Sequence, residues 1–167
     1  MEALLAISLT GEADFHVLRA SGSRVYEYDG GNDRLMVSTS TGRDWTQRQV
    51  PSPVLDLAID PRDGDRVIAT TESGLMQSRD AARSWQKLSD EVALLAWPAR
   101  DRLVMLDGAG RVSVSADGGR TTQVRGRVRG QAVSLMADRN AVYVALADGS
   151  VLESTDGGTS FTVRANV

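Results

Sequence analysis

The chain has 167 residues, of which 25% are charged, and its formal net charge is −3. This length suffices for a buried core, and so small a charge provides neither a basic surface for nucleic acid nor an acidic tail. Cysteine is absent and histidine occurs once, which excludes disulfides, thiolate metal sites and multi-histidine metal sites. No run approaches the ~18 apolar residues of a membrane helix. We therefore expect no cofactor, no metal, no nucleic-acid partner and no membrane span.

The first ten residues contain one short apolar run, residues 3–9, which we interpret as a strand left from a preceding structural unit or as an N-terminal tail. The run has no basic leader and no cleavage site, so it is a poor secretion signal. The residues themselves therefore do not determine a compartment.

From residue 11 onward, short apolar runs alternate with Gly, Asp and Ser turn residues in four groups, 11–50, 51–90, 91–129 and 130–167. The first run of each group is the most apolar and the last alternates with polar residues, the gradient expected from the inside to the outside of a propeller blade. The expected strands are 15–20, 24–28, 35–38 and 45–50; 54–59, 66–70, 74–77 and 85–88; 92–97, 102–106, 111–114 and 122–125; and 132–136, 141–145, 150–153 and 161–164.

One eight-residue stretch precedes the last strand of every group, and its clearest copy is Ser-Thr-Asp-Gly-Gly-Thr-Ser-Phe at residues 154–161. The copies begin at Ser38, Ser78, Ser115 and Ser154, so they start 40, 37 and 39 residues apart. A fixed period near forty, built from strands and turns, predicts an all-β propeller with four blades of four antiparallel strands.

Asp followed by two glycines suits a tight turn, since Asp bonds nearby backbone and Gly adopts positive φ without strain. We therefore interpret the repeated Asp as a brace of the turn and not as a ligand, and we expect the closing aromatic ring to pack between units. The positions expected to serve these turns are Ser38, Trp45, Ser78, Asp80, Trp85, Ser115, Asp117, Gly119, Ser154, Asp156, Gly158 and Phe161.

The pattern S-x-D-x-G-x-[ST]-[WF] resembles the Asp-box, or BNR repeat, of sialidases, sortilin-type ectodomains, plant photosystem-assembly propellers and many bacterial proteins called glycosyl hydrolases. The resemblance implies Asp-boxes that are structural and lie away from the catalytic face. It also suggests a secreted or extracytoplasmic location. The copies depart from the pattern at Ser40, Ala82 and Thr122.

The number of blades alone does not determine whether the chain closes a ring. Four blades could just close a ring, yet the last group already has its own outer strand, residues 161–167, so we expect the chain to be the C-terminal part of a larger propeller of about six to eight blades. A self-contained ring and an assembly of several copies are the alternatives. An open ring should expose Val17, Leu18, Val133 and Leu135 and favour self-association through blade edges.

The sequence contains no recognisable catalytic set. A glycosidase needs two carboxylates or a Tyr backed by an acid, and the sialidase resemblance also requires three arginines around a substrate carboxylate. The sialidase Arg-Ile-Pro signature and the Gly-x-Ser-x-Gly motif are absent. We therefore favour a non-catalytic scaffold that presents loops to a protein or glycan. The alternative is a fragment of a sialidase-like glycoside hydrolase that acts on an extracellular glycan.

Loops that enter the first strands, and those between second and third strands, should line one mouth of the propeller. Acids and a neutral imidazole there would suit a cation or a polar ligand, although His16 could equally bond a backbone carbonyl and the acids could be solvated. Trp97 could pack in the core or stack on a sugar. The candidate ligand-binding residues are Asp14, His16, Asp29, Glu72 and Asp107, with Asp33, Glu91 and Asp148 at the same mouth.

Overall fold

The computed structural model describes residues 15–166, with side chains from Val17 onward. These residues form sixteen strands in four antiparallel sheets of four, which confirms the expected blades, and none of them forms a helix able to cross a bilayer. The strand expected at residues 3–9 lies outside the described part. The strands are β1 Phe15–Ser21, β2 Arg24–Asp29, β3 Arg34–Ser38, β4 Trp45–Arg48, β5 Val54–Asp60, β6 Asp63–Thr71, β7 Gly74–Ser78, β8 Gln86–Ser89, β9 Ala93–Ala99, β10 Arg102–Asp107, β11 Arg111–Ser115, β12 Gln123–Arg127, β13 Ala132–Ala137, β14 Val142–Leu146, β15 Ser150–Ser154 and β16 Thr162–Asn166.

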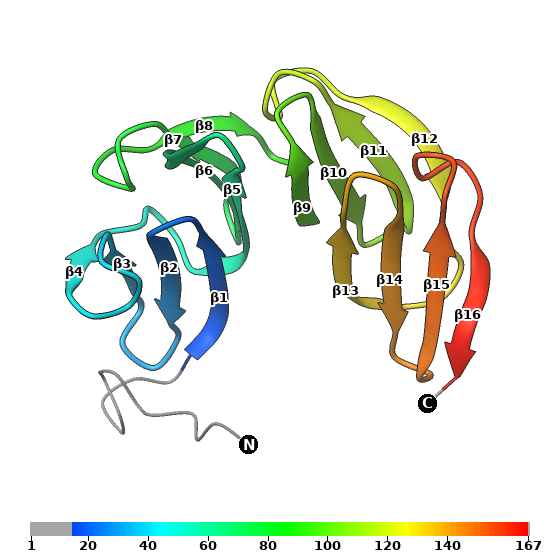
Figure 1. Ribbon diagram of the computed structural model, residues 1–167, viewed down its shortest axis with the longest axis horizontal. Helices are drawn as coiled ribbons and strands as arrows, with labels where there is room; N and C mark the ends of the chain where they lie inside the picture. Colours follow the sequence, from blue (N-terminus) through cyan, green and yellow to red (C-terminus); the bar gives the residue numbers. More distant parts are fainter. Residues whose placement is uncertain (1–14, 167) are drawn as a thin grey trace.

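Each sheet keeps its strands in chain order, and we refer to β1–β4, β5–β8, β9–β12 and β13–β16 as blades 1 to 4. The first strand of every blade is the innermost: β1, β5, β9 and β13 lie side by side around the centre, and the fourth strands lie outside (Figure 1). We call the face of a blade that is turned toward the next blade in the chain its forward face, and the opposite face its rear face.

Neighbouring blades are held together by three apolar clusters, one for each pair of blades. Strand alternation places every second side chain in such a cluster, so each blade contributes one face to the pair before it and one to the pair after it. Blades 1 and 2 share Val17, Tyr26, Tyr28, Leu35, Val37, Val54, Leu57, Ile59, Val67, Ala69 and Ala82. Blades 2 and 3 share Ala58, Ile68, Leu75, Ala93, Leu95, Trp97, Leu103 and Met105. Blades 3 and 4 share Ala96, Val104, Leu106, Val112, Val128, Leu135, Val142, Val144 and Leu146.

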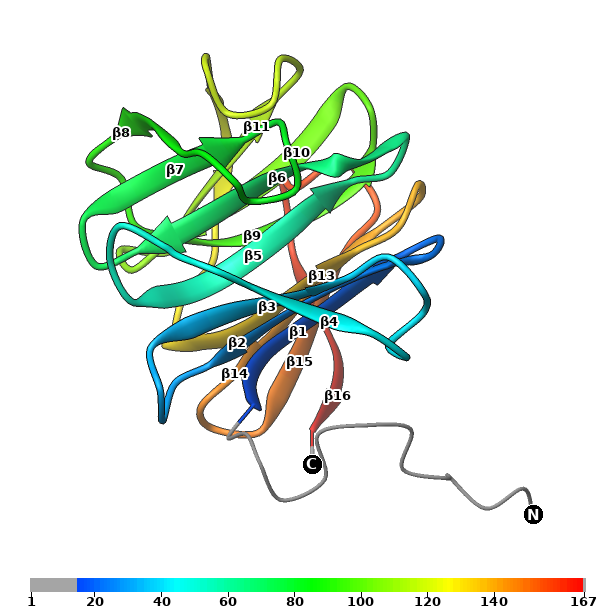
Figure 2. The same cartoon turned by 90° about the vertical axis from the view of Figure 1, so that its left-hand side faces the viewer.

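The four blades form an open arc. Blade 1 and blade 4 lie at its two ends, with the forward face of blade 4 not covered by any other strand of residues 15–166 (Figure 1), and Figure 2 views the arc from its blade 1 end. The expected exposure is confirmed for Leu18 and Val133, at 56% and 55%, but it is wrong for Val17 and Leu135, which are buried. Val17 packs against blade 2 and Leu135 against blade 3, because alternate residues of an end strand still face the neighbour that is present.

The repeated stretch forms the turn between the third and fourth strand of each blade, and we call residues 38–45, 78–85, 115–122 and 154–161 the motif turns. Two consecutive residues in each adopt positive φ, as at Gly118 (72°) and Gly119 (87°). Thr41 (59°) and Ala81 (56°) take this left-handed conformation without being glycine, which is strained for residues with a Cβ.

The motif aspartates brace these turns through hydrogen bonds. Asp117 accepts bonds from the Ser115 hydroxyl (2.8 Å), from the Thr121 amide (2.9 Å) and from the Thr121 hydroxyl (2.7 Å). These donors stabilise the carboxylate and lower the pKa of Asp117 to about 2. Asp80 and Asp156 have the same set of donors. In the first turn the Ser40 hydroxyl replaces the carboxylate and accepts from the Asp44 amide (2.8 Å).

Two of the aromatic residues that close the motif turns pack between their own blade and the blade before it. Trp85 contacts the cluster between blades 1 and 2 and donates through its indole nitrogen to the Gln49 carbonyl (3.1 Å), and Phe161 contacts the cluster between blades 3 and 4. Thr122 is exposed, and the aromatic ring between blades 2 and 3 is supplied instead by Trp97, with the Arg66 guanidinium 5.1 Å from its ring centre.

Candidate functional site

Three of the four inner strands have a β-bulge at the same place, near their first residues. The register shifts between Phe15 and Val17, between Val54 and Asp56, and between Ala132 and Ser134. Bulges redirect side chains and concentrate near binding sites. The extra residue is Leu55 in β5 and Val133 in β13, and it is His16 in β1, whose side chain lies outside the described part.

Exposed aliphatic side chains stand at the starts of three inner strands. Leu55 is 49% exposed and Val133 55%, and Val92, just before β9, is 43% exposed. Large aliphatic side chains are usually buried, so their collection at one end of the inner strands is informative.

A cavity of about 340 Å³ lies at this end of the inner strands, between blades 2, 3 and 4. We call it the mouth cavity. Three of the residues that line it are glycines, which place no side chain in it, and Gly108 has open space where a Cβ would stand. Its lining residues are Leu55, Asp56, Thr70, Val92, Ala93, Leu94, Leu106, Asp107, Gly108, Gly110, Gly130, Gln131 and Ala132.

Asp56, at the floor of the mouth cavity, is buried and ties three blades together. Its Oδ1 accepts from an Arg19 guanidinium nitrogen of blade 1 (2.6 Å) and from its neighbour's amide at Leu57 (2.8 Å). Its Oδ2 accepts from the Leu95 amide of blade 3 (2.8 Å). Both oxygens are therefore occupied, and the charge of Asp56 is paired. Sequence analysis missed this residue, although a lone acid inside the apolar run 54–59 was a visible signal.

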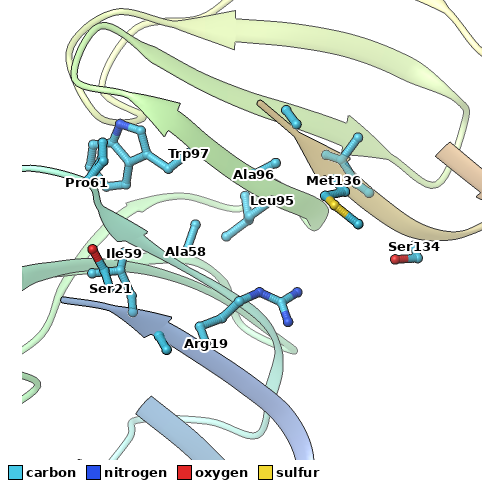
Figure 3. Close-up of a pocket in the computed structure, with 13 residues that line it drawn as sticks. Arg19, Ser21, Ala58, Ile59, Pro61, Leu95, Ala96, Trp97, Ser134 and Met136 are labelled. Carbon is cyan, nitrogen blue, oxygen red and sulfur yellow. The ribbon is translucent and has the colours of Figure 1, made fainter. Parts of the chain in front are cut away.

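A second cavity of about 510 Å³ continues along the inner strands toward their other end, and we call it the channel. Arg19 extends into it from β1, opposite Ser134 and Met136 of β13 (Figure 3). Met136 is 67% exposed. Most residues that line the channel are of apolar types, but polar and apolar atoms contribute about equally to its lining, and its Arg19 is already paired with Asp56.

The expected ligand-binding acids take part in turns of the fold. Asp29 is buried and bonds the side chains of Asn32 (2.7 Å) and Arg34 (2.9 Å), while Glu72 is exposed. Asp107 accepts from the amides of Ala109 (3.0 Å) and Arg111 (2.8 Å).

Of the predicted ligands whose side chains are described, Asp107 alone lines the mouth cavity. Asp14 and the side chain of His16 lie outside the described residues, so a ligand role for the set stays a prediction. Among residues 17–166 no group of three His or acid side chains is placed to hold a metal ion.

Trp97 is buried at 7% exposure in the cluster between blades 2 and 3, so it packs in the core.

Comparisons with solved structures support the fold. YCF48 from Cyanidioschyzon merolae superposes with a TM-score of 0.73 at 14% identity, over 96% of this chain and 59% of that chain. A GH74 xyloglucanase from Xanthomonas campestris gives a TM-score of 0.68 at 21% identity, over 91% of this chain and 25% of that chain. A structure of YCF48 bound to D1 peptide gives 0.58 at 13% identity, over 89% of this chain and 51% of that chain.

At these identities the likeness shows only the fold, which is a β-propeller arrangement. This chain spans only part of the length of each of these neighbours. No family model matches the sequence, and neither does any curated protein. Membership of the Asp-box family stays a prediction.

Proposed function

We propose that this chain is a protein-binding propeller module that takes an extended peptide segment at the mouth cavity, with an apolar side chain of the peptide reaching toward the channel. The observation that carries the proposal is the pair of bulges at the starts of β5 and β13, which leave Leu55 exposed in the lining of the mouth cavity and Val133 exposed next to the lining residue Ala132. A fold gains nothing in stability from exposing aliphatic side chains at two equivalent positions, whereas a peptide gains apolar contact there.

The charges of the site favour an uncharged anchor. Arg19 and Asp56 neutralise one another at 2.6 Å, and Asp107 is paired with Arg111 at 2.9 Å. Burying a second charge beside such a pair would cost desolvation without a free partner. Gln131 is exposed on the rim and offers an amide to the peptide backbone. An apolar anchor with uncharged neighbours is therefore the preferred ligand.

The glycan and hydrolase interpretations have less support at this site. The lining of the mouth cavity contains no aromatic platform, and its two carboxylates, Asp56 and Asp107, already accept several hydrogen bonds from the fold. Sugar binding commonly uses aromatic faces, and glycoside hydrolysis needs two carboxylates available to substrate. The neighbouring YCF48 structure with a bound D1 peptide gives a precedent for peptide binding on this fold.

The test begins with selection of peptides from a random phage-displayed library on the intact chain. Binding of the best synthetic peptide is then measured by fluorescence polarisation. Leu55→Glu and Val133→Glu should each weaken it by about tenfold or more, since central apolar contacts dominate such interfaces. Val124→Glu, which places the same change on the exposed outer strand β12, is the matched control and should bind normally.

Equal binding by all three variants would contradict the proposal. So would release of reducing sugars from xyloglucan by the purified chain, a result that would favour the hydrolase.

A further inference from the structure

The four blades can be aligned through the first serine of their motif turns. Ser38, Ser78, Ser115 and Ser154 pair across the sheet with Val25, Val67, Leu103 and Val142. One residue further along the second strand stand Tyr26, Ile68, Val104 and Tyr143, on the forward face. Three residues before the paired position stand Gly22, Gly64, Arg100 and Arg139, in or just after the turn between the first and second strands.

Between blades 1 and 2 these two positions touch. The Tyr26 hydroxyl donates to the Gly64 carbonyl at 2.6 Å. Gly64 is required there, because a Cβ would lie 2.4 Å from the Arg24 side chain. At the position of Tyr26, blades 2 and 3 have Ile68 and Val104. At the position of Gly64, the blades that these two face have Arg100 and Arg139. Tyrosine therefore occurs where the next blade has glycine, and is missing where it does not.

Tyr143 in blade 4 and Gly22 in blade 1 occupy the same two positions, but neither has its counterpart on an adjacent blade of the same chain. Tyr143 is on the uncovered forward face of blade 4, where its hydroxyl bonds Glu153 of the adjacent strand. Apart from its two chain neighbours, Gly22 has no atom of the described residues within 4 Å of where its Cβ would be, and Leu18 on the rear face of the same blade is 56% exposed. Gly22 is thus open to a partner, whereas the Tyr143 hydroxyl can donate to a new acceptor only by leaving Glu153. Blades 4 and 1, which carry the two residues, lie at opposite ends of the arc (Figure 1).

We propose that two copies of this chain close a ring of eight blades, in which the forward face of blade 4 in each copy packs on the rear face of blade 1 in the other and Tyr143 donates to the Gly22 carbonyl in place of Glu153. The contact is head-to-tail and closes after two copies, so it generates a finite ring with twofold symmetry. Eight blades lie within the range of closed propellers. On blade 1 we expect the contact along β1 and the turn that follows it. Met36 and Glu27, farther out on the same rear face, are buried and offer no exposed surface to a partner.

The proposal is independent of peptide binding, and sedimentation equilibrium of the intact chain tests it. The wild type should form a reversible dimer at low micromolar concentration. Tyr143→Phe should raise the dissociation constant about tenfold, since each ring then buries two Gly22 carbonyls without a donor. Ala145→Arg places a charge on the forward face of blade 4 and should give a monomer, while Ala147→Arg, in the adjacent exposed turn, should dimerise as the wild type does.

Because the chain lacks cysteine, cross-linking can establish the orientation. A mixture of Glu153→Cys and Ser23→Cys chains should be joined by a short bis-maleimide, whereas either variant alone should not. A monomeric wild type at tens of micromolar, a dimer unaffected by Ala145→Arg, or cross-links between two Glu153→Cys chains would each overturn the proposal. Circular dichroism confirms folding of each variant, and Tyr143→Phe keeps the test valid should Ala145→Arg misfold.

Discussion

Replacing Glu27 with glutamine should remove a pH dependence of stability that the wild type shows. Glu27 lies in the middle of blade 1, paired with Leu18 on one side and Met36 on the other. It is fully buried, and neither carboxylate oxygen has a hydrogen-bond partner. Blades 2, 3 and 4 have Ala69, Met105 and Val144 at this position.

Burial, and then the nearby charge of Asp29, raise the pKa of Glu27 from 4.5 to about 7, and Arg34 opposes the shift. A carboxyl with a raised pKa stabilises the fold fully below its unfolded value of 4.5, and this contribution is lost as the pH rises through 7. At about 1.4 kcal/mol per pKa unit, the shift corresponds to about 2–3 kcal/mol after allowance for solvent screening.

The measurement is urea unfolding at pH 5 and pH 8. The wild type should be less stable at pH 8 by about 2–3 kcal/mol, and Glu27→Gln should lose most of this difference. Glu72→Gln, the same change in an exposed loop, is the control and should behave as the wild type does. A pH dependence that persists unchanged in Glu27→Gln would refute the reasoning.

Three further predictions concern stability and are checked by thermal and chemical unfolding. Asp56→Ala should cost about 3–5 kcal/mol, because it leaves the Arg19 charge and buried amides without their acceptor; a loss below 1 kcal/mol would contradict the role given to this carboxylate. Tyr26→Phe should cost about 1–2 kcal/mol through the lost bond to the Gly64 carbonyl, and an unchanged midpoint would argue against that contact. Thr41→Gly should stabilise the fold by about 1 kcal/mol by relieving a positive φ at an exposed residue; destabilisation would show that its side chain serves the turn.

The blades could be predicted from the sequence because their signals are local and repeated. Alternation and turn residues located all sixteen described strands to within a few residues, as with β7, expected at 74–77 and observed at Gly74–Ser78. The outer strand of blade 2 begins at Gln86 instead of Trp85, and those of blades 3 and 4 likewise begin one residue later than expected.

The site could not be predicted to the same extent, because it depends on register and on contacts between blades. A bulge shifts the alternation by one residue, so the exposure of Leu55 follows from pairing that no single strand reveals. Asp56 bonds Leu95, 39 residues away, and only the assembled arc brings them together. The same applies to Val17 and Leu135, whose burial depends on which neighbour blade is present.

Hydrogen–deuterium exchange of the intact chain with and without the selected peptide tests the central claim most directly. Peptide binding at the mouth should slow exchange in residues 54–57, 92–95 and 130–135, which enclose the mouth cavity, and leave the motif turns unchanged. Protection confined to the motif turns, or to the outer strands β4, β8, β12 and β16, would contradict the assignment of the mouth as the binding site.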